Sequence, residues 1–268
     1  MYLLFGQRQN PGRLIGTHLS TTGTVPGCSR ERYSQAMTKA NEHLWEFAID
    51  TFSKWRMSTY LRSSDENTSI ALELYRWNSE LSSAYWEGIA YLEVALRNLL
   101  DKKMTQRQQI LGRSQHWIFD DFSELGRART SDTQDKQPYL EIVSAMRRVR
   151  KNRKPMTPDQ IISELSFGFW HQLVSKKQLF LWPELASGFA NAPSRNQNYI
   201  SALTLEIRDL RNRIGHHHRL TAHSIDTGYL TIISLATAMN IQLAEWIEKD
   251  SRIKSLIQNQ PMKSHLFP

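Results

Sequence analysis

The sequence predicts an all-α protein, a helical bundle that carries an irregular insertion and a disordered N-terminal tail. Apolar residues recur every three or four positions over several long stretches, which is the period of an amphipathic helix. No stretch alternates apolar and polar residues for more than a few positions, so strands are not expected. Of the 268 residues 40% are hydrophobic and eight are tryptophan, a composition that excludes wholesale disorder.

Residues 1–36 form the expected tail. They hold five glycines and two prolines among Ser, Thr and Gln, and they show no sustained apolar period. The few apolar residues after Met1 are too short a run for a secretory signal. Because the helical pattern begins soon after Met37, we expect that translation starts there. Residues 37–268 are expected to form a single α-helical domain.

Six helices are expected after the tail. The second has the longest apolar stripe, from Leu74 to Leu99, and we expect it to be the central helix. Residues 101–138 hold scattered charges and two glycines, which predicts a loop-rich insertion with short helices. Pro158 suits the first turn of the fourth helix. The six expected helices cover residues 39–55, 70–104, 139–150, a segment starting at 157, 198–214 and 225–249.

The net charge is +8, from 34 Lys and Arg against 26 Asp and Glu. Six of these basic residues lie in the sequence RRVRKNRK at residues 147–154, here called the basic run, which continues the 139–150 helix. Such a run is usually a solvated helix face. The alternative is a surface that binds RNA phosphates, and its candidate residues are Arg147, Arg148, Arg150 and Lys151.

The cysteine content and the hydropathy indicate the cellular compartment of the protein. Cys28 is the sole cysteine, which excludes a disulfide framework and a zinc site built from cysteines. A single thiol fits a reducing compartment, so we expect a cytoplasmic protein. No apolar run approaches the roughly 20 residues that cross a bilayer, so no membrane partner is expected.

The densest polar cluster lies where the 198–214 helix ends, in the sequence RNRIGHHH at residues 211–218. Helical spacing places Asn212 and His216 on one face and turns Arg211 about 100° away. An arginine binds phosphate oxygens, and a histidine transfers a proton near neutral pH. The cluster therefore suits metal-independent cleavage of RNA, with the neighbouring 2′-hydroxyl as the nucleophile.

Four segments carry a family resemblance: ALELYRWNSELSSAYWEGIAYLEVALRNLLDKKM at 71–104, TPDQIISELSFGFWHQLVS at 157–175, LWPELASGF at 181–189 and LRNRIGHHHRL at 210–220. They resemble the Abi-like (abortive infection) family of bacterial proteins, a branch of the HEPN superfamily. The resemblance implies a helical bundle, usually dimeric, with an endoribonuclease site near the dimer interface. It also implies a role in phage defence or toxin-like growth arrest, for which a neutralising partner protein is a further expectation.

The resemblance also assigns roles to residues of the motif. It implies that Arg211 binds and stabilises the scissile phosphate, that Asn212 orients it, and that His216 transfers the proton. The neighbouring His217 stays a second candidate for the working imidazole. The family often has an acidic residue after the paired histidines, where this chain has His218.

Glu93 matches an acidic position of the same family. Two interpretations are open for it. Glu93 stands four residues before Arg97, so the two side chains can pair on one helix face. Alternatively, Glu93 supports the site by orienting Arg211.

Two functions compete with the nuclease. One is a catalytically silent helical module that binds RNA or forms a dimer. The other is a metal-dependent hydrolase that uses His216, His218 and His223. Because no adjacent acid or cysteine completes an obvious ligand set, we expect no metal and no cofactor.

Overall fold

The computed structural model describes residues 30–130, 133–194 and 196–261. Within these ranges the chain forms α-helices and short 3-10 helices and no strand, which confirms the all-α prediction. The α-helices are α1 (Arg30–Phe52), α2 (Lys54–Arg62), α3 (Thr68–Ile110), α4 (Tyr139–Lys151), α5 (Pro158–Ser163), α6 (Phe167–Leu173), α7 (Trp182–Leu185), α8 (Gln197–Gly215), α9 (Ala222–Met239), α10 (Ile241–Lys249) and α11 (Ile253–Gln258). The 3-10 helices are η1 (Trp117–Phe119), η2 (Lys176–Leu181) and η3 (Ala186–Gly188).

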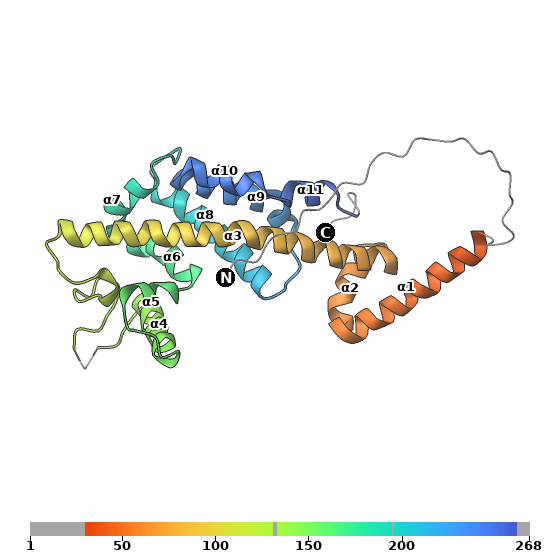
Figure 1. Ribbon diagram of the computed structural model, residues 1–268, viewed down its shortest axis with the longest axis horizontal. Helices are drawn as coiled ribbons and strands as arrows, with labels where there is room; N and C mark the ends of the chain where they lie inside the picture. The colour runs from red at the N-terminus through yellow and green to blue at the C-terminus, as the bar shows by residue number, and fades with distance from the viewer. Residues whose placement is uncertain (1–29, 131–132, 195, 262–268) are drawn as a thin grey trace, which may run out of the picture.

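Helix α3 is the central element of the fold. Its 43 residues span about 65 Å at 1.5 Å per residue. In Figure 1 it runs along the long axis of the molecule, with α9, α10 and α11 on one side and α4, α5 and α6 on the other. Leu81, Leu92 and Leu96 of its apolar stripe are fully buried. The other helices are therefore arranged around this stripe, as the sequence predicted for the 70–104 segment.

The main hydrophobic core lies between α3 and the helices that follow it. Trp117, Phe169 and Trp170 meet there, and the ring centroids of Phe169 and Trp170 are 5.0 Å apart in an edge-to-face arrangement. Burying a large apolar side chain stabilises the folded state by about 1.5–3 kcal/mol. This aromatic group thus joins the connection after α3 to α6.

The insertion is shorter than predicted, because α3 continues to Ile110 instead of ending near residue 104. Arg107 in its last turn is buried and binds Glu124 with nitrogen-oxygen distances of 2.6 and 3.0 Å, and Arg113 adds a bond of 2.8 Å. Burial raises the pKa of the Glu124 carboxyl, but the hydrogen bonds and charges of the two arginines outweigh it and lower the pKa to about 2. These long-range ion pairs stabilise the helix end, and periodicity does not reveal them.

Two expected helices in the later part of the chain are each divided in two. The 225–249 segment breaks at Asn240, whose backbone is extended and whose side chain accepts a hydrogen bond from Gln242 N at 2.8 Å. The segment that starts at 157 becomes α5 and α6, since the backbone of Ser166 is extended. Helix α11 was not predicted, because six residues are too short for a clear period.

The N-terminal part also differs from the prediction. Residues 1–29 of the expected tail lie outside the described residues, and α1 begins at Arg30, before the expected boundary at Met37. The expected 39–55 helix breaks at Ser53, which has φ of 74° and caps α2. Several of its large apolar side chains are exposed, among them Phe47 at 57% and Trp55 at 84%.

Candidate active site

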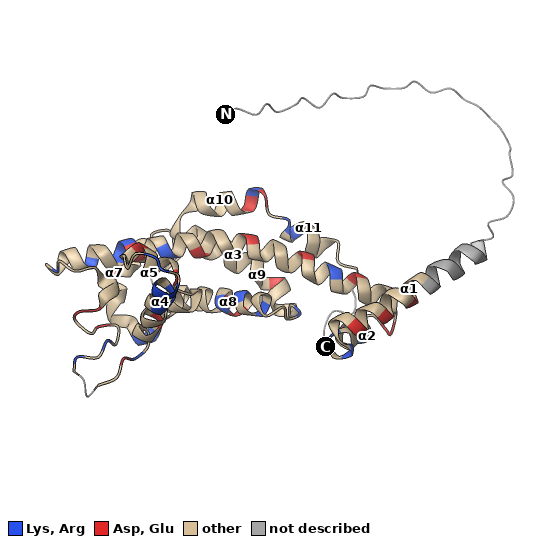
Figure 2. Ribbon diagram, turned by 60° about the horizontal axis from the view of Figure 1, so that its bottom comes forward, with Lys and Arg blue, Asp and Glu red and all other residues tan. Residues whose placement is uncertain are grey.

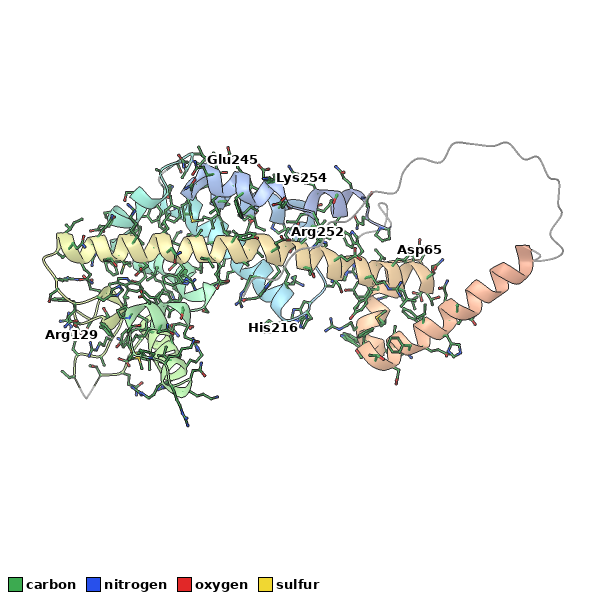
Figure 3. The ribbon with its side chains drawn as sticks, viewed as in Figure 1. Asp65, Arg129, His216, Glu245, Arg252 and Lys254 are labelled. Carbon is green, nitrogen blue, oxygen red and sulfur yellow. The ribbon has the colours of Figure 1, made fainter. Side chains whose placement is uncertain are left out.

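Helix α8 presents the polar cluster at its C-terminal end. Asn196 caps the other end, with its side-chain oxygen accepting a hydrogen bond from Asn198 N at 2.9 Å. The apolar residues Ile207, Leu210 and Ile214 are buried and attach the helix to the core. Asn212 is exposed as a result. Figure 3 shows His216 at the end of this helix, projecting from the bundle on the side of α3 away from α10 and α11.

The three consecutive histidines form the turn that ends α8. The backbone N–H of His216 donates to Asn212 O at 3.0 Å, that of His217 to Ile214 O at 2.8 Å, and that of His218 to Arg213 O at 2.8 Å. His217 has φ of 55°, a left-handed conformation that normally favours glycine. The chain therefore leaves the helical conformation at His217.

Contacts from α2 and α3 hold the chain after the turn. Arg56 donates to the carbonyl of His217, and Arg219 donates to the carbonyl of Thr59 at 2.9 Å. The buried backbone N–H of Leu220 donates to Asn78 Oδ1 at 2.9 Å. The segment 216–220, here called the histidine loop, is thus fixed by groups from two other helices.

Arg211 faces α3. Its Nε lies 3.8 Å from Glu93 Oε2, and its guanidinium carbon lies 5.4 Å from the centroid of the Trp86 ring. The Nε is buried and makes no hydrogen bond to any described group. Trp86 is missing from the sequence prediction, although it stands two helical turns before Glu93 and shares its face of α3. Glu93 and Trp86 together hold the guanidinium against the bundle.

The environment of Glu93 bears on its two interpretations. Burial raises the pKa of the Glu93 carboxyl, and the charges of Arg211 and Arg97 oppose that effect. Within the described residues, Glu93 makes an ion pair with Arg211 and none with Arg97. The structure therefore brings Glu93 and Arg211 together, which is the geometry that the supporting role requires.

Asn212 and His216 line a cavity of about 490 Å³ between α8 and α9, here called the α8–α9 pocket. Glu206 lies in its wall and accepts a hydrogen bond from the Thr231 hydroxyl at 2.6 Å. Arg211 is not among the lining residues. The side chain of Arg211 thus lies on another face of α8 than those of Asn212 and His216, as the helical spacing predicted. A single copy of α8 therefore presents the motif on two faces.

A second cavity of about 810 Å³ lies on the other side of the histidine loop, between α2 and α3, here called the α2–α3 pocket. His217 and Gly215 line it, together with residues of α1, α2 and α3. His218 lines both pockets. The histidine loop therefore forms the wall that the two pockets share.

The basic run lies apart from the motif. Figures 1 and 2 place α4 and the end of α8 on the same side of α3 but at different points along its length. The helical part of the run ends at Lys151, so the run continues α4 only in part. Arg148 pairs with Glu164 at 3.4 Å, whereas Arg147 and Arg150 are exposed and have no ion-pair partner among the described residues.

Neither a metal-binding cluster nor a membrane-spanning helix is found among the described residues. In the part of the chain that the structure describes, no group of three or more His, Cys, Asp or Glu side chains could hold a metal ion. His216, His218 and His223 therefore do not form the ligand set of the metal hypothesis there. The helices of the same part include none with the length and apolar character needed to cross a bilayer.

A comparison with known protein families found a match to one family. The model of the family described as Abi-like protein matches residues 44–222. The matched region runs from α1 to the start of α9 and includes the central helix, Glu93, the motif and the histidine loop. Comparisons with curated proteins and with solved structures returned no match.

The hydrogen bond from Leu220 to Asn78 gives a test of how the histidine loop is held. Asn78→Ala leaves a buried N–H without a partner, so we expect the free energy of unfolding to fall by about 2 kcal/mol. Amide exchange at Leu220 should become faster in this variant. Asn98→Ala, at an exposed position of the same helix, should change unfolding by less than about 0.5 kcal/mol. Equal effects of the two substitutions would show that Asn78 does not anchor the loop.

Proposed function

Because the chain belongs to the Abi-like protein family, we propose that it is a metal-independent endoribonuclease that acts in abortive infection or toxin-like growth arrest. The family description suggests phage defence, and the nuclease is our inference from the motif. The observation that carries it is the arrangement at the end of α8. There Arg211 lies beside Glu93, Asn212 follows it in the chain on an exposed face, and His216 stands exposed five residues after Arg211.

The proposed reaction follows from these groups. The 2′-hydroxyl oxygen attacks the adjacent phosphorus, its bond to phosphorus forms, and the bond from phosphorus to the 5′-oxygen breaks. His216 accepts the proton of the attacking hydroxyl, and the leaving 5′-oxygen takes a proton from solvent. The guanidinium of Arg211 offsets the charge that develops on the phosphate oxygens, while the Asn212 amide donates a hydrogen bond to them. The products are a 2′,3′-cyclic phosphate and a 5′-hydroxyl.

We further propose that the working form is a homodimer. Arg211 and His216 lie on different sides of one α8, so a second copy that places its own α8 nearby would supply the complementary face. The resemblance to the HEPN superfamily supports the same arrangement. A neutralising partner protein that covers the histidine loop would keep such a cytoplasmic nuclease inactive. A protein that co-purifies with the chain and protects the backbone amides of the three histidines from hydrogen exchange would reveal such a partner.

The cleavage experiment separates the competing functions. RNA incubated with the purified protein in EDTA should be cut to products with 2′,3′-cyclic phosphate ends. Arg211→Ala and His216→Ala should each lower the rate by at least about a hundredfold, since each removes a group that acts on the transition state. The matched controls Arg76→Ala and His43→Ala change the same residue types at exposed positions outside the motif and should cleave like the parent.

The other outcomes are equally specific. Binding without cleavage by the parent protein would favour the catalytically silent module. Cleavage that appears only when a divalent metal is added would favour the metal-dependent hydrolase. Motif variants that fold and cleave as fast as the parent would show that the site lies elsewhere, and light scattering that finds only a monomer would contradict the homodimer.

The basic run is proposed as a phosphate-binding surface that adds affinity and takes no part in the chemistry. Replacing Arg147, Arg150 and Lys151 by Gln should weaken RNA binding and reduce the slope of log K against log salt by about 2, at roughly 0.7 per lost phosphate contact with single strands. The control Lys176→Gln with Lys177→Gln removes exposed charge elsewhere and should change the slope less per charge. An unchanged slope of log K against log salt in the triple variant would show that the basic run is only a solvated helix face.

Arg148 belongs to the predicted set but is held differently. Its side chain donates to the carbonyl of Glu164 at 2.5 Å and pairs with its carboxylate. Replacing Arg148 therefore disturbs the contact between α4 and α5 as well as removing a charge. For this reason the binding experiment leaves Arg148 in place.

A further inference from the structure

The α2–α3 pocket has features of a ligand site that the proposed chemistry does not use. Its volume of about 810 Å³ exceeds that of the α8–α9 pocket. Pockets of roughly 300–1,000 Å³ are typical of small-ligand sites. The walls come from α1, α2, α3 and the histidine loop, so the pocket exists only when these parts are packed together.

Aromatic rings form one part of the wall. Phe52 and Tyr75 lie with their ring centroids 5.1 Å apart, and Tyr75 in turn meets Tyr60 edge to face at 5.2 Å. Trp86 lines the pocket from α3 and is 41% exposed, and Phe52 is 38% exposed. Ring faces left in contact with solvent in a concave site are suited to stacking on a planar ligand.

The polar part of the wall is free of carboxylates. No Asp or Glu is among the residues that line this pocket, whereas Glu206 and Asp209 line the α8–α9 pocket. Arg56 lines the pocket and uses one guanidinium nitrogen for the carbonyl of His217, and the guanidinium has further N–H groups that can bind an anion. A site with aromatic faces, a cation and no acid fits a ligand that has both a planar ring and a negative charge.

Serine hydroxyls in the pocket wall can accept hydrogen bonds from a ligand. The hydroxyls of Ser79 and Ser83 donate to carbonyls of their own helix, at 3.2 and 2.9 Å. Their oxygen lone pairs are then left to accept hydrogen bonds from the amino groups of a base. The pocket thus offers acceptors for a base and donors for a phosphate.

We propose that the α2–α3 pocket binds one unpaired nucleotide of an RNA strand, with its base against Phe52, Tyr75 and Trp86 and its phosphate at Arg56. That this strand is the one being cleaved rests on the proposed function. His217 and His218 form the wall that this pocket shares with the motif, and Arg211 lies over the Trp86 ring. The bound nucleotide is therefore a neighbour of the scissile phosphate, and the protein selects RNA that is single-stranded at that point.

The test uses a fluorescent 2′-O-methyl oligoribonucleotide, which has no attacking hydroxyl and cannot be cleaved. Ser83→Glu places a carboxylate in the acid-free pocket at an exposed helix position, so binding should weaken about tenfold or more. The matched control Ser255→Glu adds the same charge on α11, outside the pocket, and should bind within twofold of the parent.

A second pair of variants tests the stacking. Phe52→Leu removes a ring from the pocket and should weaken binding about tenfold, the effect of losing one base–aromatic stack. Trp55→Leu removes an exposed ring outside the lining and should change binding less than twofold. An oligonucleotide with one abasic position should bind the parent about tenfold more weakly and should lose little further affinity for Phe52→Leu.

The outcomes separate this proposal from the proposed function. Binding by the parent that Ser83→Glu and Phe52→Leu weaken supports the nucleotide site, even if no RNA is ever cleaved. Full affinity in both variants overturns it. Full affinity together with conversion of a dimer into a monomer by Ser83→Glu also overturns it, and assigns the pocket to contact between two copies of the chain.

Discussion

The burial of one continuous stripe of α3 is the constraint on which the rest of the structure depends. The stripe is covered by helices from the later part of the chain, so α8 and α9 are fixed relative to this helix. Asn78, Trp86 and Glu93 follow one another at intervals of eight and seven residues, about two helical turns each. Together they contact the histidine loop and Arg211. The core helix is therefore also the support of the candidate site.

The end of α8 divides the residues of the proposed chemistry between two faces. Arg211 is held against α3, where its charge opposes the rise in the pKa of Glu93 that burial causes. Asn212 and His216 line the pocket between α8 and α9. The left-handed residue His217 directs its own side chain into the pocket on the α3 side. A single helix terminus thus presents the proposed phosphate-binding arginine, the proposed proton-transfer group and a wall of a second pocket.

Much of the fold could be predicted from periodicity, because the buried faces of α3, α8 and α9 repeat every three or four residues. The true end of α3 could not be predicted, since it depends on the Arg107–Glu124 ion pair between residues far apart in sequence. For the site, the motif spacing predicted the separation of Arg211 from His216. The roles of Asn78 and Arg56 depend on tertiary contacts with the histidine loop, for which the sequence holds no local pattern.

The proposed mechanism requires that RNA contacts the protein at His216. Its most direct test is the NMR spectrum of histidine-labelled protein, with the His216 signal assigned by its loss in His216→Gln, during titration with a non-cleavable 2′-O-methyl oligonucleotide. We expect the ring signals of His216 and His217 to shift to saturation along the binding curve, while that of the exposed His43 on α1 stays in place. Saturated binding that leaves the His216 signal unmoved would show that RNA does not contact His216.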